Sequence, residues 1–438
     1  MTIAKAFYCP RCEERVFHLK FQMDDSINWR PWPFSIECDN CGAIIDGRLQ
    51  MEVRHDKSSS PTEIPDLEII PKLKSADYND DGAVFAYSNT LPVPEYLYYQ
   101  PWKGPGISSV FLVVSSMVDS DIVVAYGRQM AQLERDVIRY DSSLNSLSQL
   151  LRGSRTNIKA FKKTLQDKLG LTPKETPSIN SWTECYDIYH ELHRTVLKML
   201  NRGDNSVLPL FKFLITGLVN LGQDKVNECR QALMEILDEK FSNYSKKLYI
   251  RLDQCVQELW KLLPGLFVDI YDSQNLQLDN QLRLVTSSLD DVENLFRDNF
   301  NFLARYMPFI MGIYNLIANG TLNKFFDKEG NELKYNLIDF LKCPDGKRIE
   351  LMSTIPILQT ALSEAMNHHI RNGIDHEDSE YDLSTQLCTY YYERQGEKKS
   401  EQCYLIRLAH MCVMQIRWLA NLSWVMRILE IGTIQTEN

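Results

Sequence analysis

The chain has 438 residues, of which 44% are hydrophobic and 24% are charged, and its formal net charge is −10. This length allows about two to four domains, each with a buried core. The acidic balance argues against a protein that coats nucleic acid, so a nucleic-acid site would have to be a local basic patch or a small catalytic centre.

The sequence carries no sign of export or membrane insertion. No apolar leader follows Met1, and no run approaches the roughly eighteen uncharged apolar residues that a membrane span needs. Seven of the eleven cysteines stand singly along the chain, which is typical of reduced thiols rather than of a disulfide framework. We therefore expect a cytoplasmic protein without a membrane partner.

The other four cysteines form two Cys-x-x-Cys pairs within residues 1–56: Cys9, Cys12, Cys38 and Cys41. Four thiolates in two tight turns can surround one tetrahedral Zn²⁺ and leave no position for a catalytic water, so the metal should be structural. The 25 residues between the pairs exceed the usual spacing, which predicts a long hairpin rich in tryptophan and proline between them. Residues 1–56 thus resemble a zinc ribbon.

Two further segments follow the ribbon. Residues 57–118 are rich in proline and turn residues and predict an irregular connector with room for strands; the apolar run Val110 to Val114 fits either a strand or a helix start. Residues 119–276 keep apolar side chains three and four apart, which predicts a helical middle domain with one helix from about Ser178 to Asn201. In that helix, His190 and His193 lack metalloprotease spacing and are interpreted as part of an ordinary helix face.

Residues 277–438 predict a helical bundle, so the chain as a whole is expected to be mainly α. Ser288 and Asp291 have the spacing of a helix start. A later helix should be capped by Thr354, carry Pro356 in its first turn and run to His369, which the apolar stripe places in the bundle.

The end of the chain has a strand-like and a helical part. Thr385 to Tyr392 is rich in β-branched and aromatic residues and predicts a strand, and residues 395–400 predict a polar turn. A closing helix from about Gln402 to Ile431 is apolar over more than half of its circumference. Such a helix should be buried in a bundle or in a dimer interface.

Between these helices stands Arg371-Asn372-Gly373-Ile374-Asp375-His376. RNA can be cut by its own 2′-hydroxyl if a protein supplies a base, an acid and positive charge near the reacting phosphate. Histidine suits the proton transfers because its reference pKa is near neutral, and arginine suits the charge because its planar fork binds two phosphate oxygens. This chemistry needs no metal ion.

The Arg-Asn-x-x-x-His spacing, the helix before it and the strand-turn and apolar helix after it resemble the ribonuclease branch of the HEPN-domain family. The resemblance covers roughly residues 285–432 and implies a metal-independent endoribonuclease that forms a homodimer through this bundle. It implies His376 as general acid and base, Arg371 as the group that stabilises the phosphate and Asn372 as the residue that orients the pair.

The resemblance also implies a prokaryotic anti-phage defence or toxin effector with RNA as substrate and a protein or phage-derived trigger. Asp375 places negative charge beside the expected phosphate site, which should weaken RNA affinity. An alternative is a catalytically inactive HEPN-like and zinc-ribbon interaction module that binds a protein or nucleic-acid partner. A zinc-ribbon regulator of nucleic acid is the third hypothesis.

Overall fold

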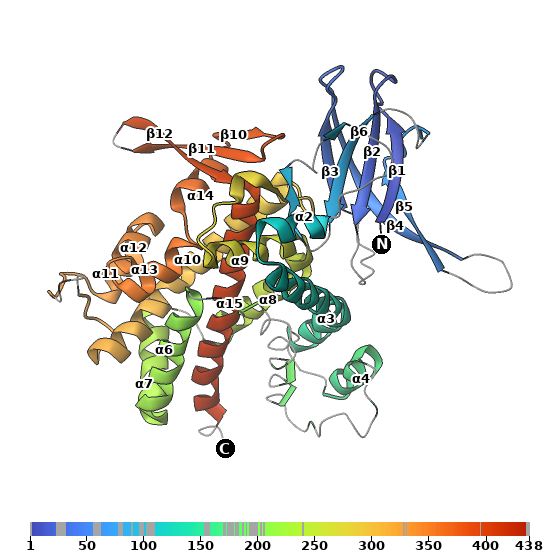
Figure 1. The fold of residues 1–438 in the computed structure, drawn as a ribbon. Helices are drawn as coiled ribbons and strands as arrows, with labels where there is room; N and C mark the ends of the chain where they lie inside the picture. The colour runs from blue at the N-terminus through green and yellow to red at the C-terminus, as the bar shows by residue number, and fades with distance from the viewer. Residues whose placement is uncertain are drawn as a thin grey trace. The chain divides into compact units, whose positions relative to one another are not determined.

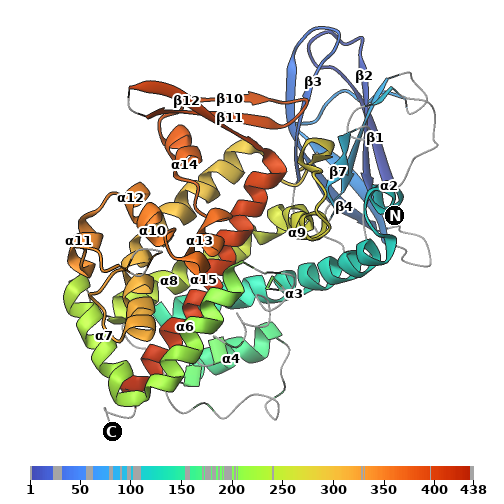
Figure 2. The same ribbon diagram turned by 60° about the vertical axis from the view of Figure 1, so that its left-hand side comes forward.

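We describe the chain from a computed structural model (Figures 1 and 2). The structure describes all residues except 1, 23–31, 56–62, 78–81, 89–90, 96–99, 102–109, 153–157, 170–171, 173–178, 180–183, 186–187, 190, 192–199, 202–203, 205, 239–240, 327–328, 330, 395 and 435–438. Helices form most of the regular structure and sheets accompany them, which agrees with the expected mainly α class. Among the described helices, none has the length and apolar character that crossing a membrane requires.

Two compact units interleave along the chain. The first unit comprises Met1–Asp136, Glu258–Asn294 and His376–His410. The second unit comprises Val137–Gln257, Leu295–Asp375 and Met411–Asn438. Composition along the sequence suggests only consecutive segments, because it does not register contacts between residues that are far apart in the chain.

Two antiparallel hairpins carry the cysteine pairs at their turns. In one, β1 (Thr2–Tyr8) pairs with β2 (Val16–Gln22); in the other, β3 (Trp32–Glu37) pairs with β4 (Ile44–His55). The predicted long hairpin between the pairs does not join β2 to β3, since these strands lie in different sheets; residues 23–31 of that prediction lie outside the described residues. Each strand pairs across its own short Cys-x-x-Cys turn, where closing the loop costs the least chain entropy.

The predicted connector supplies strands to both sheets. β5 (Glu63–Ile70) extends the second sheet to the order β3-β4-β5, and β6 (Ala83–Ser88) lies parallel to β2 in the order β1-β2-β6-β8, where β8 is Gln100–Pro101. The rings of Phe7 and Phe34 lie 6.1 Å apart, so side chains from both sheets share one apolar core. This β-structure is therefore larger than the expected ribbon.

The rest of the first unit mixes short helices with a meander of strands. Its remaining elements are α2 (Val110–Met117), the start of α3 (Ser120–Arg152), η1 (Leu259–Phe267), α9 (Val268–Ser273), η2 (Asp279–Gln281), β7 (Val93–Pro94) paired with β9 (Leu282–Arg283), and the sheet β10 (Ser379–Asp382), β11 (Leu387–Arg394) and β12 (Glu397–Tyr404). The run from Val110 is thus a helix. The predicted strand is present as β11, whereas most of the predicted polar turn belongs to β12.

The second unit is a bundle of helices. Its described elements are the rest of α3, α4 (Ile158–Leu169), α6 (Val207–Leu221), α7 (Gln223–Leu237), α8 (Phe241–Glu258), α11 (Leu337–Lys342), α12 (Asp345–Met352), α13 (Pro356–Ser363), α14 (His368–Asp375) and most of α10 (Leu289–Asn319) and α15 (Leu405–Ile434), whose first turns belong to the first unit. Most of the expected helix Ser178–Asn201, with His190 and His193, lies outside the described residues.

The closing helix α15 is buried, as its apolar circumference predicts. Two of its large polar side chains within the second unit donate to backbone oxygens: Arg417 Nε donates to Leu200 at 2.6 Å and Trp418 Nε1 donates to Ala361 at 2.9 Å. A buried donor is tolerated only when it is paired in this way. Burial within the chain's own bundle therefore accounts for the apolar pattern.

The start of α10 follows the prediction, because the Asp291 amide donates to Ser288 Oγ at 3.2 Å. The predicted single helix from Thr354 to His369 is wrong, since α13 ends at Ser363 and α14 begins at His368. Asn367 Oδ1 accepts the amides of His369 and Ile370 at 3.0 and 3.3 Å and caps a new helix. Thr354 is not a cap either: its hydroxyl donates to the Leu351 carbonyl.

Candidate functional site

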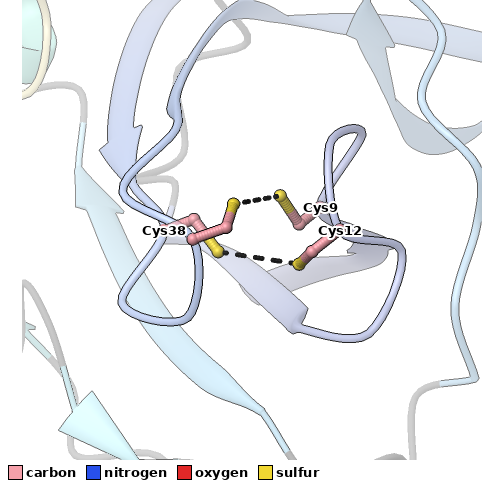
Figure 3. Close-up of side chains that lie close together, drawn as sticks. Cys9, Cys12 and Cys38 are labelled. Carbon is pink, nitrogen blue, oxygen red and sulfur yellow. Dashed lines mark hydrogen bonds between the residues drawn. The ribbon is translucent and has the colours of Figure 1, made fainter.

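The four cysteines of the two Cys-x-x-Cys pairs, in the first unit, lie together. Cys9 Sγ is 3.7 Å from Cys41 Sγ, and Cys12 Sγ is 4.0 Å from Cys38 Sγ (Figure 3). All four sulfur atoms lie within 4.8 Å of one another. The two hairpins thus present their turns to a common point.

The two turns have matching backbone geometry. Glu13 and Gly42, each directly after the second cysteine of a pair, adopt left-handed φ angles of 56° and 65°. Their amides donate back to the carbonyls of Cys9 and Cys38 at 3.0 and 2.7 Å. This loop closes each Cys-x-x-Cys segment so that both of its thiols face the same side.

The sulfur distances fit a tetrahedral metal ion such as Zn²⁺. Four thiolates about 2.3 Å from zinc would be separated by roughly 3.8 Å, close to both measured distances. Amide hydrogen bonds from Glu14 and Arg15 lower the pKa of Cys12 to about 6, so its thiolate forms readily. Burial raises the pKa of Cys38 to about 12, and the positive charge of a bound ion would offset this effect.

The sequence-predicted catalytic arginine lies in the second unit, on α14. The Nε and Nη2 atoms of Arg371 donate to Asn301 Oδ1 at 3.0 and 2.9 Å, and Nη1 donates to Asn372 Oδ1 at 3.2 Å. The same Nη1 lies 3.1 Å from Asp375 Oδ2, one helical turn along α14. The guanidinium therefore has a fixed orientation.

Arg371 remains accessible despite these contacts. Its side chain is 27% exposed, and its guanidinium carbon lies 5.9 Å from the centre of the Phe300 ring. Asn301 and Phe300 come from α10, seventy residues earlier in the chain. Their helix was predictable, but no pattern in the sequence points to Asn301 as the partner of Arg371.

The histidines are placed differently from the arginine. His376 is exposed and follows α14 directly, at the start of the segment that belongs to the first unit. His369 is only half-buried, and its ring lies against that of His368, with 3.9 Å between the centroids and 39° between the ring planes. The structure thus brings Arg371 and Asn372 together, adds Asn301 and Asp375, and does not bury His369 in the bundle core.

Comparison with protein families, with curated proteins and with solved structures finds no match to this chain.

Proposed function

We propose that the chain is a metal-independent endoribonuclease whose Arg371, Asn372 and His376 act on RNA. The observation that carries the proposal is the guanidinium of Arg371, which is oriented by Asn301 and Asn372 and still partly open to solvent. An arginine held in this way can bind a phosphate without first losing side-chain freedom. The exposed His376 follows in the chain at the end of the same helix.

The roles follow from the chemistry of each group. His376 takes the proton of the 2′-hydroxyl or returns one to the leaving 5′-oxygen. Arg371 stabilises the negative charge of the phosphorane, and Asn372 holds its Nη1. A phosphate would compete with Asp375, which occupies the same Nη1 through an ion pair. Displacement of that carboxylate is therefore part of RNA binding.

The remaining expectations belong to the same proposal. Two protomers bring two copies of the Arg371 and His376 pair to one cleft, which forms a homodimer with a composite site. A structural Zn²⁺ on the four cysteines stabilises the first unit, and a protein or phage-derived trigger releases activity in the cytoplasm during defence. The support for this part is the resemblance to HEPN ribonucleases and the cysteine geometry.

The test is cleavage of labelled RNA by the purified protein in magnesium-free buffer, together with RNA integrity and growth in expressing cells. We expect His376→Ala and Arg371→Ala to lower the rate by about 10²- to 10³-fold, since each removes a proton-transfer or charge-stabilising group. His368→Ala and Arg305→Ala remove an adjacent histidine and an exposed arginine and should cut like the wild type. Equal cleavage and equal toxicity of all four variants would reject the nuclease.

One observation favours a second function. Each nitrogen of the Arg371 guanidinium already has a partner, and one partner is the carboxylate of Asp375. A bundle in which this pair stays closed would serve as a binding module without activity. Purified protein that leaves all RNA intact, with and without cell extract from infected cells, supports this second function over the first.

A further inference from the structure

The strand β3 (Trp32–Glu37) stands at the edge of its sheet, whose order is β3-β4-β5. The Cys38 amide donates to the Ala43 carbonyl at 2.8 Å. The backbone amides and carbonyls of the even-numbered residues of this strand therefore point toward β4. Because hydrogen-bonding direction alternates in an antiparallel pair, the amides and carbonyls of Ser35 and Glu37 point away from β4. Pro33, which has no amide, falls on the same outer side, where proline is tolerated.

A groove adjoins this strand, and its larger part also reaches over the neighbouring strand β4, where Ile44, Asp46 and Arg48 line it. It consists of a cavity of about 790 Å³ and a cavity of about 440 Å³, and both are lined by Ser35 and Leu383. Within the described residues, no backbone partner occupies the outer side of Ser35 or Glu37. Among the described residues, the strand edge is therefore unpaired beside the groove.

The opposite wall of the groove is rigid. Arg283 Nε donates to the Ser384 carbonyl at 3.1 Å, and the side chain of Gln386 exchanges two hydrogen bonds of 2.8 Å with the backbone of Leu284. Ser287 also lines the larger cavity; it is 6% exposed, and its Oγ has no hydrogen-bond partner among the described residues. A buried hydroxyl without a partner is costly, which points to a polar ligand group at this place.

The groove is acidic with one apolar contact. Its described lining includes six carboxylates and two basic side chains. Glu37, Asp46 and Asp290 have no ion pair among the described residues, whereas Lys261 is held by Glu258 and Asp291 at 2.6 and 3.4 Å. Ile44 is 63% exposed beside them. A partner must therefore bring positive charge and some apolar surface.

We propose that an extended, basic peptide segment of a partner protein binds this groove as an additional strand on β3. Its backbone pairs with the amides and carbonyls of Ser35 and Glu37, and its lysine or arginine side chains face Glu37, Asp46 and Asp290. RNA is disfavoured because its phosphates would meet these carboxylates. The groove belongs to the first unit alone, and peptide binding there does not depend on whether Arg371 and His376 cut RNA.

The test screens the full-length, zinc-loaded chain against a library of unstructured decapeptides of varied charge. We expect the selected peptides to carry lysine or arginine at alternate positions. Hydrogen exchange should then slow at the Ser35 and Glu37 amides on binding of the best peptide, and not at Phe34 and Ile36, which already bond to β4. N-methylation of alternate peptide amides, which leaves the charge unchanged, should abolish binding.

Two variants separate the groove from general charge. Glu37→Lys combined with Asp46→Asn should weaken the peptide by about tenfold at low salt, whereas Asp167→Lys on α4 should leave its affinity within about twofold. Zinc content and circular dichroism show that each variant is folded. The proposal is overturned if no basic peptide is selected, if the double variant binds the peptide equally well, or if single-stranded RNA is the better ligand. It is also overturned if the chain is a dimer that the double variant converts to monomers, because the occupant of the groove would then be a second copy of this chain.

Discussion

The two units complete their polar interactions by different means. In the first unit, four thiols converge on one point, and the distances between them suit an ion rather than one another. In the second unit, groups such as Arg417, Trp418 and Arg371 end on oxygen atoms of the same unit. The first arrangement can hold a metal ion from outside the chain, whereas these three groups of the second unit are paired within the unit.

The two units also differ in how much of a site a sequence motif specifies. Two Cys-x-x-Cys pairs describe nearly the whole of a metal site, because all four ligands have the same chemistry and each pair is a local turn. An Arg-x-x-x-x-His spacing describes only part of a catalytic site. The orientation of the Arg371 guanidinium depends on its hydrogen bonds to Asn301, and no sequence pattern links these two residues.

Loss of a cysteine ligand should have the largest effect. We expect about one Zn²⁺ per wild-type chain and none in Cys38→Ser, with loss of β-structure, since structural zinc contributes on the order of 10 kcal/mol to such folds. Elemental analysis and circular dichroism measure both. Cys343→Ser, which alters a half-buried thiol in the second unit, should keep its metal. A folded wild type without metal contradicts the assignment.

Release of Arg371 should have the next largest effect. Asp375→Asn removes the carboxylate from Nη1, and we expect RNA cleavage to rise several-fold while the free energy of unfolding changes by less than about 1 kcal/mol, as is usual for a partly exposed ion pair. Asp378→Asn, in the same acidic stretch but paired with Lys398, serves as control. Slower cleavage in Asp375→Asn would show that the carboxylate assists the reaction.

The two left-handed turn positions allow a smaller test within the first unit. A Cβ added at Gly42 meets no atom within 4 Å, so the cost of Gly42→Ala comes from its φ of 65° alone and should be about 1 kcal/mol. Glu13→Gly at the matching position relieves the same strain but loses the contact with Lys74, so little net change is expected. Denaturation at saturating zinc compares the two. If Glu13→Gly destabilised the protein as much as Gly42→Ala does, Glu13 would carry no left-handed strain and the two turns would not be equivalent.

The smallest effect concerns a half-buried carboxylate of the second unit, that of Glu430. Burial raises the pKa of Glu430, which accepts hydrogen bonds from Ser245 and Tyr249. The folded state therefore holds this proton more tightly than the unfolded state, and stability falls as pH rises from the ordinary glutamate range through the raised pKa. The Gln side chain in Glu430→Gln cannot ionise. We therefore expect the free energy of unfolding of the variant, relative to that of the wild type, to be larger at pH 8 than at pH 4.

Chemical denaturation at the two pH values measures this difference. Glu350→Gln on the surface of α12, where the carboxylate pairs with Lys347, provides the comparison. A pH-independent difference between Glu430→Gln and the wild type would contradict the assignment.

Local signals predicted some elements well and missed others for identifiable reasons. Ser288 caps α10 and the apolar closing helix is buried, because capping and periodicity depend on neighbours in sequence. The sequence does not predict the break before α14, because the apolar stripe continues across it. The break comes from the Asn367 side chain, which accepts an amide hydrogen bond from His369 and starts a new helix. The polar residues of β12 look like a turn, yet their pairing with β11 makes them a strand.

The sequence by itself determined the cluster of four cysteines, the mainly α character of the chain and the position of Arg371 and His376 at the end of a helix. These depend on spacing and periodicity, which act over a few residues. Only the tertiary structure decided that β5 and β6 join the cysteine hairpins, that Asn301 orients Arg371 and that β3 stands at the edge of its sheet beside an acidic groove. Such contacts join residues tens of positions apart, and their energy depends on packing that no local pattern records.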